Sequence, residues 1–535
     1  MNDNLKSQTA FSPQKRKLLE QMLASKGLAT SAAQKAAMIP RRPQNAGAPL
    51  GLNQEGLWFI DQMDPGQAHY NIPGTVRLRG RLNVAALQKS FHEIVCRHEI
   101  LRTTFAINAD GVPYQVIAAA RPVELPVIDL RAWPVEKRET EIVRLATAAA
   151  QKTFDLANDP LFFFQLLQLG EEEHVFILNF HHIVCDGWSM GVFTAELRLL
   201  YEAFSKNESS PLPALPIQYA DFAIWERERL QGEFLQTRLG YWKKQLGGRL
   251  PVLELPTDKP RPAVQSFRGR HQSLMIPKPL TGALKVLAQR EHVTLFNVLL
   301  AAFKTLLYRY SMQDDVIVGT GIANRERREV ENLIGYFATV LPLRTNLSGN
   351  PAFRELLQRV REVIWDATAN QGLPLSQLVQ ELQPERDPSR NPIYQTEFTL
   401  LTPDRNPAVY GFGMSRVMET IQLGDLIMTP VEIEGGISRF DLAIFIWDMP
   451  EGLCGTIEYC TDLFEDASIT RVIAGFKILL EFVVADPDLR LLRLIERLDK
   501  LQPDLRAKSY QETMQQKLKT LKRRPAGATG NNANS

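Results

Sequence analysis

The spacing of hydrophobic residues along the chain predicts a fold in which helices and strands are mixed. The apolar run HVFILNF (174–180) predicts a strand, and WSMGVFTAELRLLYEAF (188–204) has the spacing of a helix. Beyond a proline-rich segment, LPTDKPRPAV (255–264), a second mixed region begins with a helix predicted over 294–310. It ends near a long apolar stretch at 463–487. The pattern therefore predicts an α+β fold with two lobes of similar size.

The two ends of the chain differ from this middle part. Ser12-Pro13 is a favoured helix start and Gly27 a possible helix end, so a helix is expected over 13–26, followed by a flexible leader. The stretch 506–524 is basic and is expected to be a solvated tail. The expected organisation is an N-terminal helix and leader at 1–47, lobes at 48–235 and 236–500, and a basic tail at 501–535.

Composition narrows the class of protein. The chain has 535 residues, of which 44% are hydrophobic and 23% charged, as in globular proteins that bury a large core. Its 62 basic and 60 acidic residues give a net charge of +2, so no overall field favours nucleic acid or an anionic membrane. No apolar run reaches about 18 residues, and charges interrupt the first 30, which argues against a membrane span or a signal peptide. The four scattered cysteines are expected to be reduced thiols in a cytoplasmic protein.

The segment NFHHIVCDGWSM (179–190) carries the strongest chemical pattern. Two histidines close a predicted strand, and an Asp-Gly pair follows just before a predicted helix. If the strand continues through both histidines, His181 and His182 point to opposite sides, one into packing and the other toward a cavity. Asp186 is expected in the turn into the helix, and Gly187 permits close approach by a substrate.

The start of the helix offers a second possible function. The amides of Trp188 and Ser189 are expected at a helix N-terminus, where partial positive charge can favour an oxyanion. Two other interpretations of the segment are weaker. Cys185 is expected to be a small packing residue rather than a nucleophile, and a metal site is disfavoured because adjacent histidines diverge on a strand.

The segment resembles the HHxxxDG signature of the condensation domains of nonribosomal peptide synthetases, members of the chloramphenicol acetyltransferase-like superfamily. Further segments resemble other motifs of that family, in the family's order, so that the resemblance covers about 48 to 490. These segments are LNQEGLWFIDQMDPGQAHYNIP (52–73), RHEILRTTF (97–105), IQYADFAIW (217–225), IGYFATVLPLR (334–344), NQGLPL (370–375) and RDPSRNPI (386–393). One departure is Thr339, where the family usually has an asparagine, so substrate positioning at that wall is open.

The resemblance implies a fold and a reaction. The fold would be two chloramphenicol acetyltransferase-like lobes in a V-shaped pseudo-dimer, with the active site at their junction. The reaction would join an acyl or peptidyl thioester to the amine of an aminoacyl thioester. Both substrates would hang on the phosphopantetheine of carrier proteins, and the chain itself would bind no cofactor or metal.

The resemblance also assigns roles to single residues. His182 would be the catalytic histidine, either as general base or in positioning the amine. Asp186 would be structural and pair with an arginine across the lobes, for which Arg325 is the best candidate. Gly187 would stay small where the pantetheine thioester passes.

Other motif residues are given no part in the chemistry. His98 and Arg102 are expected to be architectural, and Arg386 and Arg390 to be loop cations. The wording HHIVCDGWS and RHEILRT resembles the subtype that joins two L-configured units.

The absence of adenylation and carrier signatures, with Met1 and the basic tail, favours a free-standing monomeric unit that receives donor and acceptor carriers in trans. Two alternatives stay open. One is an acyltransferase of the same superfamily that uses a free amine or alcohol, and the other is a catalytically silent platform that recruits a partner to a loaded carrier.

Overall fold

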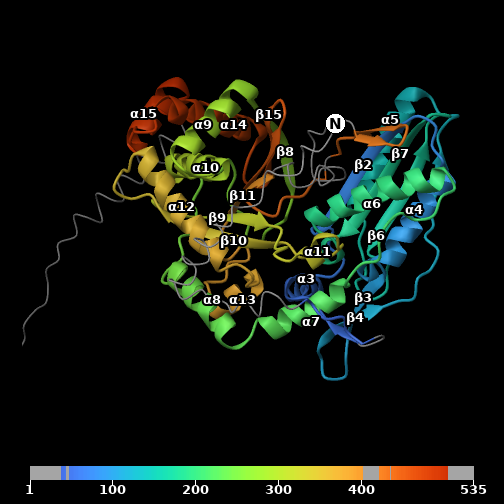
Figure 1. Cartoon of the computed structure of the whole chain (residues 1–535). Helices are drawn as coiled ribbons and strands as arrows, with labels where there is room; N and C mark the ends of the chain where they lie inside the picture. The colour runs from blue at the N-terminus through green and yellow to red at the C-terminus, as the bar shows by residue number, and fades with distance from the viewer. Residues whose placement is uncertain (1–37, 44–46, 402–420, 434, 504–535) are drawn as a thin grey trace, which may run out of the picture.

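The computed structural model describes residues 38–43, 47–401, 421–433 and 435–503, which form two lobes lying side by side (Figure 1). Each lobe is built on a six-stranded sheet covered by helices. The predicted α+β class with two lobes is confirmed. The helix predicted at 13–26 and the basic segment 506–524 lie outside the described residues.

The N-terminal lobe has the strand order β12-β13-β2-β7-β6-β5, beside a small sheet β1-β4-β3. Helices α4 and α6 pack on one face of the large sheet, and α5 packs on the other face. Its elements from the first half of the chain are β1 (Ala48–Pro49), α3 (Leu52–Met63), β2 (Asn71–Arg79), α4 (Val84–Arg97), η1 (Glu99–Arg102), β3 (Thr103–Ile107), β4 (Pro113–Ile117), β5 (Val127–Asp129), α5 (Val135–Ala150), β6 (Phe162–Gln168), β7 (Glu173–His181), η2 (His182–Val184), α6 (Gly187–Ser205) and α7 (Tyr219–Arg229).

The C-terminal lobe has the strand order β10-β9-β11-β14-β15-β8. The elements of the second half are α8 (Gly232–Gln245), β8 (Gly269–Pro277), α9 (Lys278–Arg290), α10 (Leu295–Ser311), β9 (Asp315–Ile322), α11 (Arg328–Glu331), β10 (Thr339–Asn346), α12 (Phe353–Ala369), α13 (Leu375–Leu382), β11 (Thr396–Leu401), β12 (Ile421–Leu423), β13 (Leu426–Pro430), β14 (Leu442–Met449), β15 (Gly452–Cys460), α14 (Asp466–Ala485) and α15 (Leu491–Leu501).

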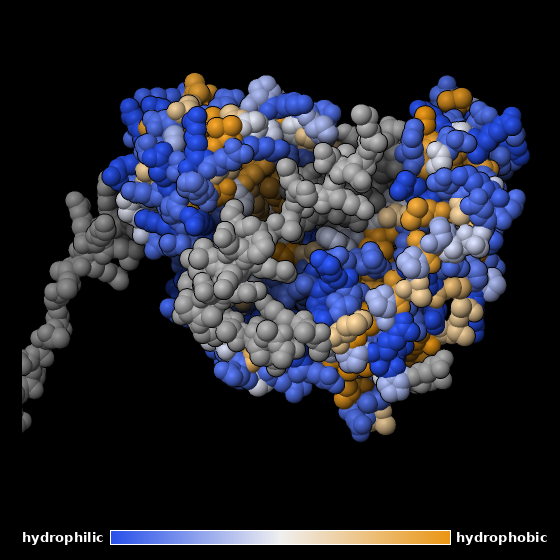
Figure 2. Space-filling view, in the orientation of Figure 1, coloured by the Kyte–Doolittle hydropathy of each residue, from blue (hydrophilic) through white to orange (hydrophobic). Residues whose placement is uncertain are grey.

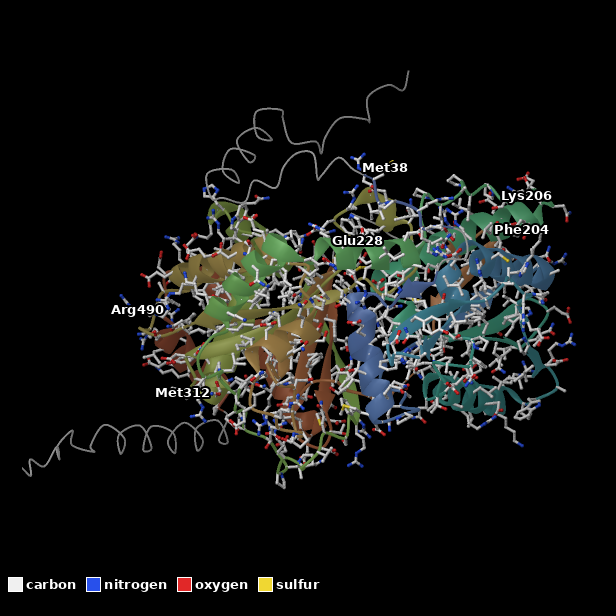
Figure 3. The ribbon with its side chains drawn as sticks, turned by 90° about the horizontal axis from the view of Figure 1, so that it is seen from below. Met38, Phe204, Lys206, Glu228, Met312 and Arg490 are labelled. Carbon is white, nitrogen blue, oxygen red and sulfur yellow. The ribbon has the colours of Figure 1, made fainter. Side chains whose placement is uncertain are left out.

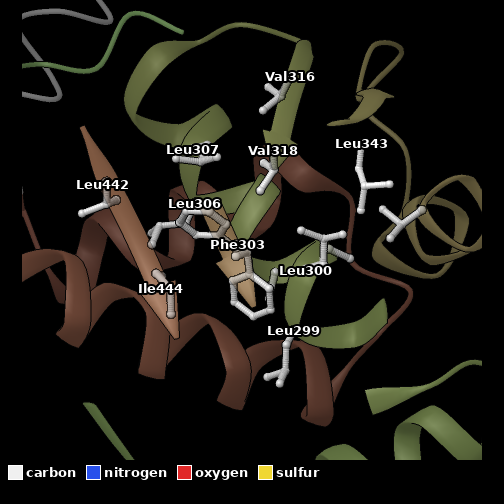
Figure 4. Packing of buried hydrophobic residues seen from close by; sticks show 14 of the residues in the cluster. Leu299, Leu300, Phe303, Leu306, Leu307, Val316, Val318, Leu343, Leu442 and Ile444 are labelled. Atoms are coloured by element: carbon white, nitrogen blue, oxygen red, sulfur yellow. The ribbon is translucent and has the colours of Figure 1, made fainter. Parts of the chain in front are cut away.

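Helix α10 lies at the centre of the C-terminal core. Thr294 caps its start, since its hydroxyl accepts a hydrogen bond from the Asn297 amide at 3.3 Å. Apolar residues surround the helix, as expected of a helix that is buried on all sides. Leu299, Leu300 and Phe303 pack there against Val318, Leu442 and Ile444 of the sheet (Figure 4).

The second half of the chain also contributes to the N-terminal lobe. Strand β13 pairs antiparallel with β2, with Met428 opposite Leu78, and extends that sheet by two strands (Figure 1). Val330 and Phe337 pack into the N-terminal core. The prediction that 236–500 forms one lobe is therefore wrong for these segments, because strand pairing across hundreds of residues leaves no local mark in the sequence.

The predicted boundaries also need correction at two other points. Helix α8 begins at Gly232, and its Leu239 and Trp242 already belong to the C-terminal core, so position 235 falls inside a helix. Residues 38–43 are not part of a loose leader. Ile39 is 2% exposed, and Arg42 bonds to Asp221 at 2.8 Å.

Helix α7 carries the chain from one lobe toward the other. In Figure 3, Glu228 of α7 lies between Phe204 and Lys206 at one end of the molecule and Met312 and Arg490 at the other. Hydrophobic side chains are visible in Figure 2 at the inner margins where the lobes face each other. Among the described residues, no helix is both long and apolar enough to cross a bilayer.

Candidate active site at the lobe junction

The two histidines diverge because the strand ends between them. Strand β7 stops at His181, and His182 opens the 3-10 turn η2, its amide donating to the Tyr70 carbonyl at 2.7 Å. His181 is 4% exposed, meets Phe154 edge-on, and accepts a hydrogen bond from the Ile183 amide on Nδ1 at 3.2 Å. The expectation that one histidine packs is confirmed for His181. The strand does not run through both histidines, because it ends at His181.

Burial keeps His181 neutral. Burial, together with a smaller effect of the neighbouring His182, lowers the pKa of this imidazole to about 3. A neutral ring suits a position inside the N-terminal lobe, where a charged imidazole would be costly.

His182 lies at the junction of the lobes. Its ring meets the ring of Tyr336 edge-on, with centroids 4.8 Å apart. Its Nδ1 atom is buried, and no other residue in the described part of the chain bonds to it. Burial and, to a smaller extent, the charge of Arg439 lower the pKa of His182 to about 4, although the charge of Asp186 opposes both. The imidazole is therefore neutral at physiological pH and can accept a proton.

Asp186 joins the start of α6 to the segment before β10. It is the N-cap of α6, and Ser189 donates to its Oδ1 twice, from the amide at 2.8 Å and from the hydroxyl at 2.7 Å. Oδ2 accepts from the amides of Phe337 and Ala338, both at 3.0 Å. Burial alone would raise the pKa of Asp186, but the charge of Arg325 and these donors hold it below its usual value.

Arg325 is the cross-lobe partner that the sequence suggested. Its Nη2 lies 3.2 Å from Oδ1 of Asp186, and both side chains are 1% exposed. The guanidinium also donates to the carbonyls of Val330 and Leu333, and it stacks on the ring of Phe337 at 4.0 Å. The ion pair therefore fixes the segment that leads into β10.

At the start of α6, one of the two amides that were expected to favour an oxyanion is already bonded. The amide of Ser189 is occupied by Asp186, and its hydroxyl accepts from the Gly335 amide at 3.0 Å, so this residue joins the lobes. The indole of Trp188 donates to the Glu331 carbonyl at 2.8 Å, which makes a further bond across the junction. Gly187 is the first residue of α6, and its role beside a thioester stays a prediction.

Two motif residues are architectural, as predicted. His98 is 1% exposed, and its Nε2 lies 2.8 Å from the Glu196 carboxylate while its Nδ1 accepts from the Ile334 amide at 3.3 Å. Arg102 donates to the Ala118 carbonyl within the N-terminal lobe. Neither side chain contacts His182.

Three further residues lie apart from the chemistry. Thr339 shares its strand face with the core residues Leu341 and Leu343, and its buried hydroxyl has no hydrogen-bond partner within the described ranges. This placement favours packing over substrate contact. Cys185 is buried beside the sulfur of Met190, in agreement with a packing role. Arg390 pairs with Asp387 at 2.7 Å, as a loop cation would.

Sequence reasoning missed Tyr336 and Arg439. Tyr336 lies inside the recognised segment 334–344, where it precedes a core phenylalanine and is held by the Tyr219 hydroxyl, which donates to its carbonyl at 2.8 Å. Arg439 comes more than 250 residues after His182, so only the fold brings its charge near the imidazole.

Comparison with known proteins identifies the relatives of this chain. The family model described as "Condensation domain" matches residues 44–499. A linear gramicidin synthase of Brevibacillus parabrevis is 44% identical over 449 residues, which are 83% of this chain and 6% of that protein. Phosphinothricin tripeptide synthetase PhsC of Streptomyces viridochromogenes is 36% identical over 89% of this chain and 42% of its own length. The chain thus spans less than half the length of these synthetases.

Solved structures share the fold. The X-domain from teicoplanin biosynthesis is 28% identical with a TM-score of 0.75, covering 85% of this chain and 99% of that one. SgcC5 from Streptomyces globisporus, solved with (R)-(-)-1-(2-naphthyl)-1,2-ethanediol and sucrose, is 26% identical with a TM-score of 0.65, covering 83% of this chain and all of that one. The family model and the relatives together show that this chain belongs to the condensation-domain family of nonribosomal peptide synthetases.

Proposed function

We propose that this chain forms an amide bond between a carrier-bound acyl or peptidyl thioester and the amine of a carrier-bound aminoacyl thioester. The observation that carries the proposal is the neutral imidazole of His182 at the lobe junction, with a pKa lowered to about 4. A neutral imidazole can take the proton that the amine nitrogen loses as it bonds to the carbonyl carbon, whereas a charged imidazole cannot.

The bond changes follow from that role. The amine nitrogen attacks the thioester carbonyl carbon, and the carbon–sulfur bond breaks once the tetrahedral intermediate has formed. His182 accepts the proton that the nitrogen loses and returns it to the departing thiolate. The main chain of His182 itself and the charge of Asp186 both raise the pKa of the ring, against burial and the charge of Arg439, which lower it.

Asp186 and Arg325 act as positioning residues. Their pair holds the main chain at Phe337 and Ala338, and so keeps Tyr336 against the ring of His182. The carriers, their phosphopantetheine arms and the subtype that joins two L-configured units belong to the same proposal. They rest on the motif wording and on the synthetases that the chain resembles.

Two other functions have support in the comparisons. Transfer to a free acceptor is compatible with the small diol bound to SgcC5. A recruiting platform is compatible with the teicoplanin X-domain, which was solved in complex with OxyB. His182 with its lowered pKa favours catalysis over a silent platform.

The test uses two purified carriers, one loaded with an acyl-aminoacyl thioester and the other with an aminoacyl thioester. Amide formation is followed by mass spectrometry with wild type, His182→Ala and the exposed control His292→Asn. We expect His182→Ala to lower the rate by roughly 100-fold or more, a usual share of acid–base catalysis, and the control to match wild type. Equal rates for all three would refute the role of His182, and product from free amines alone would favour the free-acceptor function.

A further inference from the structure

One carboxylate near the lobe junction has no part in the chemistry described above. Glu397 lies on β11, a strand between β9 and β14, where it pairs with Gly319. Its neighbour Phe398 packs into the core against Phe303 of α10, with ring centroids 5.5 Å apart. Because side chains alternate along a strand, Glu397 and Thr399 point away from α10, to the other face of the sheet.

The carboxylate of Glu397 is held in place but not neutralised. Its side chain is 7% exposed, and its one hydrogen bond within the described chain comes from the Thr399 hydroxyl, which donates to Oε1 at 3.2 Å. That hydroxyl accepts in turn from the Gly321 amide at 3.3 Å, so its proton is directed at the carboxylate. Glu397 makes no ion pair with any described lysine, arginine or histidine. Burial raises its pKa, and the opposing effects of the Arg439 charge and the Thr399 hydroxyl do not cancel that rise.

The residue beside the carboxylate, Gly321, has no side chain. Gly321 is partly exposed, and a Cβ at that position would lie 3.5 Å from Oε1 of Glu397 and 3.6 Å from the Thr399 hydroxyl. A glycine there leaves the carboxylate open to a group that approaches over the sheet, which a larger side chain would cover.

Tyr336 connects this position to the candidate catalytic histidine. Its ring meets His182 at 4.8 Å, and the charges of Arg439 and Glu397 both act on its hydroxyl. A substrate whose reacting amine or carbonyl lies at His182 therefore has Tyr336 alongside and Glu397 beyond it. That distance suits recognition of a substrate side chain rather than of the reacting group.

We propose that Glu397 is a specificity-determining residue that binds an ammonium or guanidinium group on the side chain of a carrier-bound substrate. The proposal rests on the proposed function, because it places that substrate at His182. The same chemistry fits a cationic side chain on the donor unit or on the acceptor unit. Glu397 then supplies the countercharge, and the Thr399 hydroxyl orients it.

A structural role for Glu397 as the countercharge of Arg439 is the competing explanation, since each acts on the pKa of the other. The two explanations differ in stability. A partner of Arg439 should destabilise the protein when it is neutralised, whereas an unpaired buried carboxylate should not.

The experiment measures binding of stable pantetheine amides to the full chain by titration calorimetry, independently of turnover. Lysyl- and norleucyl-pantetheine amide represent the acceptor, and their Nα-acetyl forms represent the donor. We expect the lysyl ligand of one pair to bind wild type at least about tenfold more tightly than its norleucyl counterpart, as a charged hydrogen bond requires. Glu397→Gln should reduce that ratio to near one, and Thr399→Val should reduce it in part.

Each outcome is decisive. Asp448→Asn, a change to a carboxylate at the far end of β14 that pairs with Lys285, should keep the wild-type ratio. Glu397→Gln should also melt no lower than wild type. An unchanged lysyl-to-norleucyl ratio in both pairs, or a lower melting temperature with equal losses for both ligands, would overturn the proposal. Selective binding without amide formation would uphold it and refute the proposed function instead.

Discussion

Oδ1 of Asp186 and Nη2 of Arg325 lie 3.2 Å apart, although 139 residues separate them in the sequence, and both side chains are only 1% exposed. The carboxylate receives four further hydrogen bonds, two of which come from the main chain of Phe337 and Ala338, just before β10. The pair therefore holds the segment that presents Tyr336, and in the proposed reaction it would act through position alone.

The first prediction concerns the coupling of this pair. Asp186→Ala and Arg325→Ala should each lower the free energy of unfolding by about 3–5 kcal/mol, because each leaves a buried charge unpaired. The double variant should lose about 0.5–3 kcal/mol less than the sum. Urea unfolding of the four proteins measures this coupling energy, and a value of zero would show that the two residues act independently.

A second prediction concerns the pKa of His182. Arg439 lowers it, so Arg439→Met should raise it from about 4, by roughly one unit. The imidazole would then become protonated at a higher pH, and the pH below which the rate falls would rise with it. NMR titration of ¹⁵N-labelled histidines, with His182→Asn to assign the signal, reports the value directly. A signal that titrates at the same pH in both proteins would count against the field of Arg439.

The third prediction concerns His181 and stability. Its pKa is about 3 in the folded protein and about 6.5 when unfolded, so the unfolded chain binds the proton more readily between these values. The contribution of the neutral His181 to the free energy of unfolding is complete above pH 6.5. It is lost as the pH falls below that value, by up to about 1.4 kcal/mol per pH unit. His181→Asn should flatten the decline in urea midpoint between pH 7 and 5. The control His292→Asn should leave the slope unchanged, and equal slopes for both variants would contradict the assignment.

The fourth prediction concerns Lys304, which is fully buried in α10 and donates to the carbonyls of Leu343 at 2.6 Å and Val316 at 3.3 Å. Burial lowers its pKa to about 7, against about 10.4 unfolded, so the unfolded chain binds more protons between pH 7 and 10. Unfolding should therefore become less favourable as the pH rises through this range. Lys304→Met should remove the rise, while Lys285→Met at the partly exposed pair with Asp448 should retain it. A rise of the same size in both variants would place its origin in other groups.

Local patterns in the sequence carried the prediction of the elements around the site. The apolar run at 174–180 and the helical spacing at 188–204 are found as Glu173–His181 and Gly187–Ser205, within two residues at each end. Local sequence also indicates the position of Asp186, since an aspartate before an apolar helix is a favoured cap. The partnership with Arg325 came from the family resemblance and not from spacing.

Two of the missed features depend on distant contacts. Only the fold brings the charge of Arg439 near the His182 ring. Strand β13 pairs with β2 although about 350 residues separate them in the chain. The Ser189 amide is a different case, because it donates to the side chain of Asp186, the helix cap that the sequence indicates. The oxyanion interpretation overlooked this cap and assumed a free helix end. Periodicity reports which face of an element is buried, but not which distant segment buries it.

Strands β12 and β13 come from the second half of the chain but belong to the sheet of the N-terminal lobe. This limits how the chain can be divided into fragments. A fragment that stops after α7 would leave the edge of β2 without its partner, and a sheet edge with unpaired main-chain groups is a template for aggregation. A fragment that starts at α8 would carry β12 and β13 with no sheet to join. We therefore expect neither half to fold alone. Exchange of parts between related synthetases should then transfer residues 38–503 together.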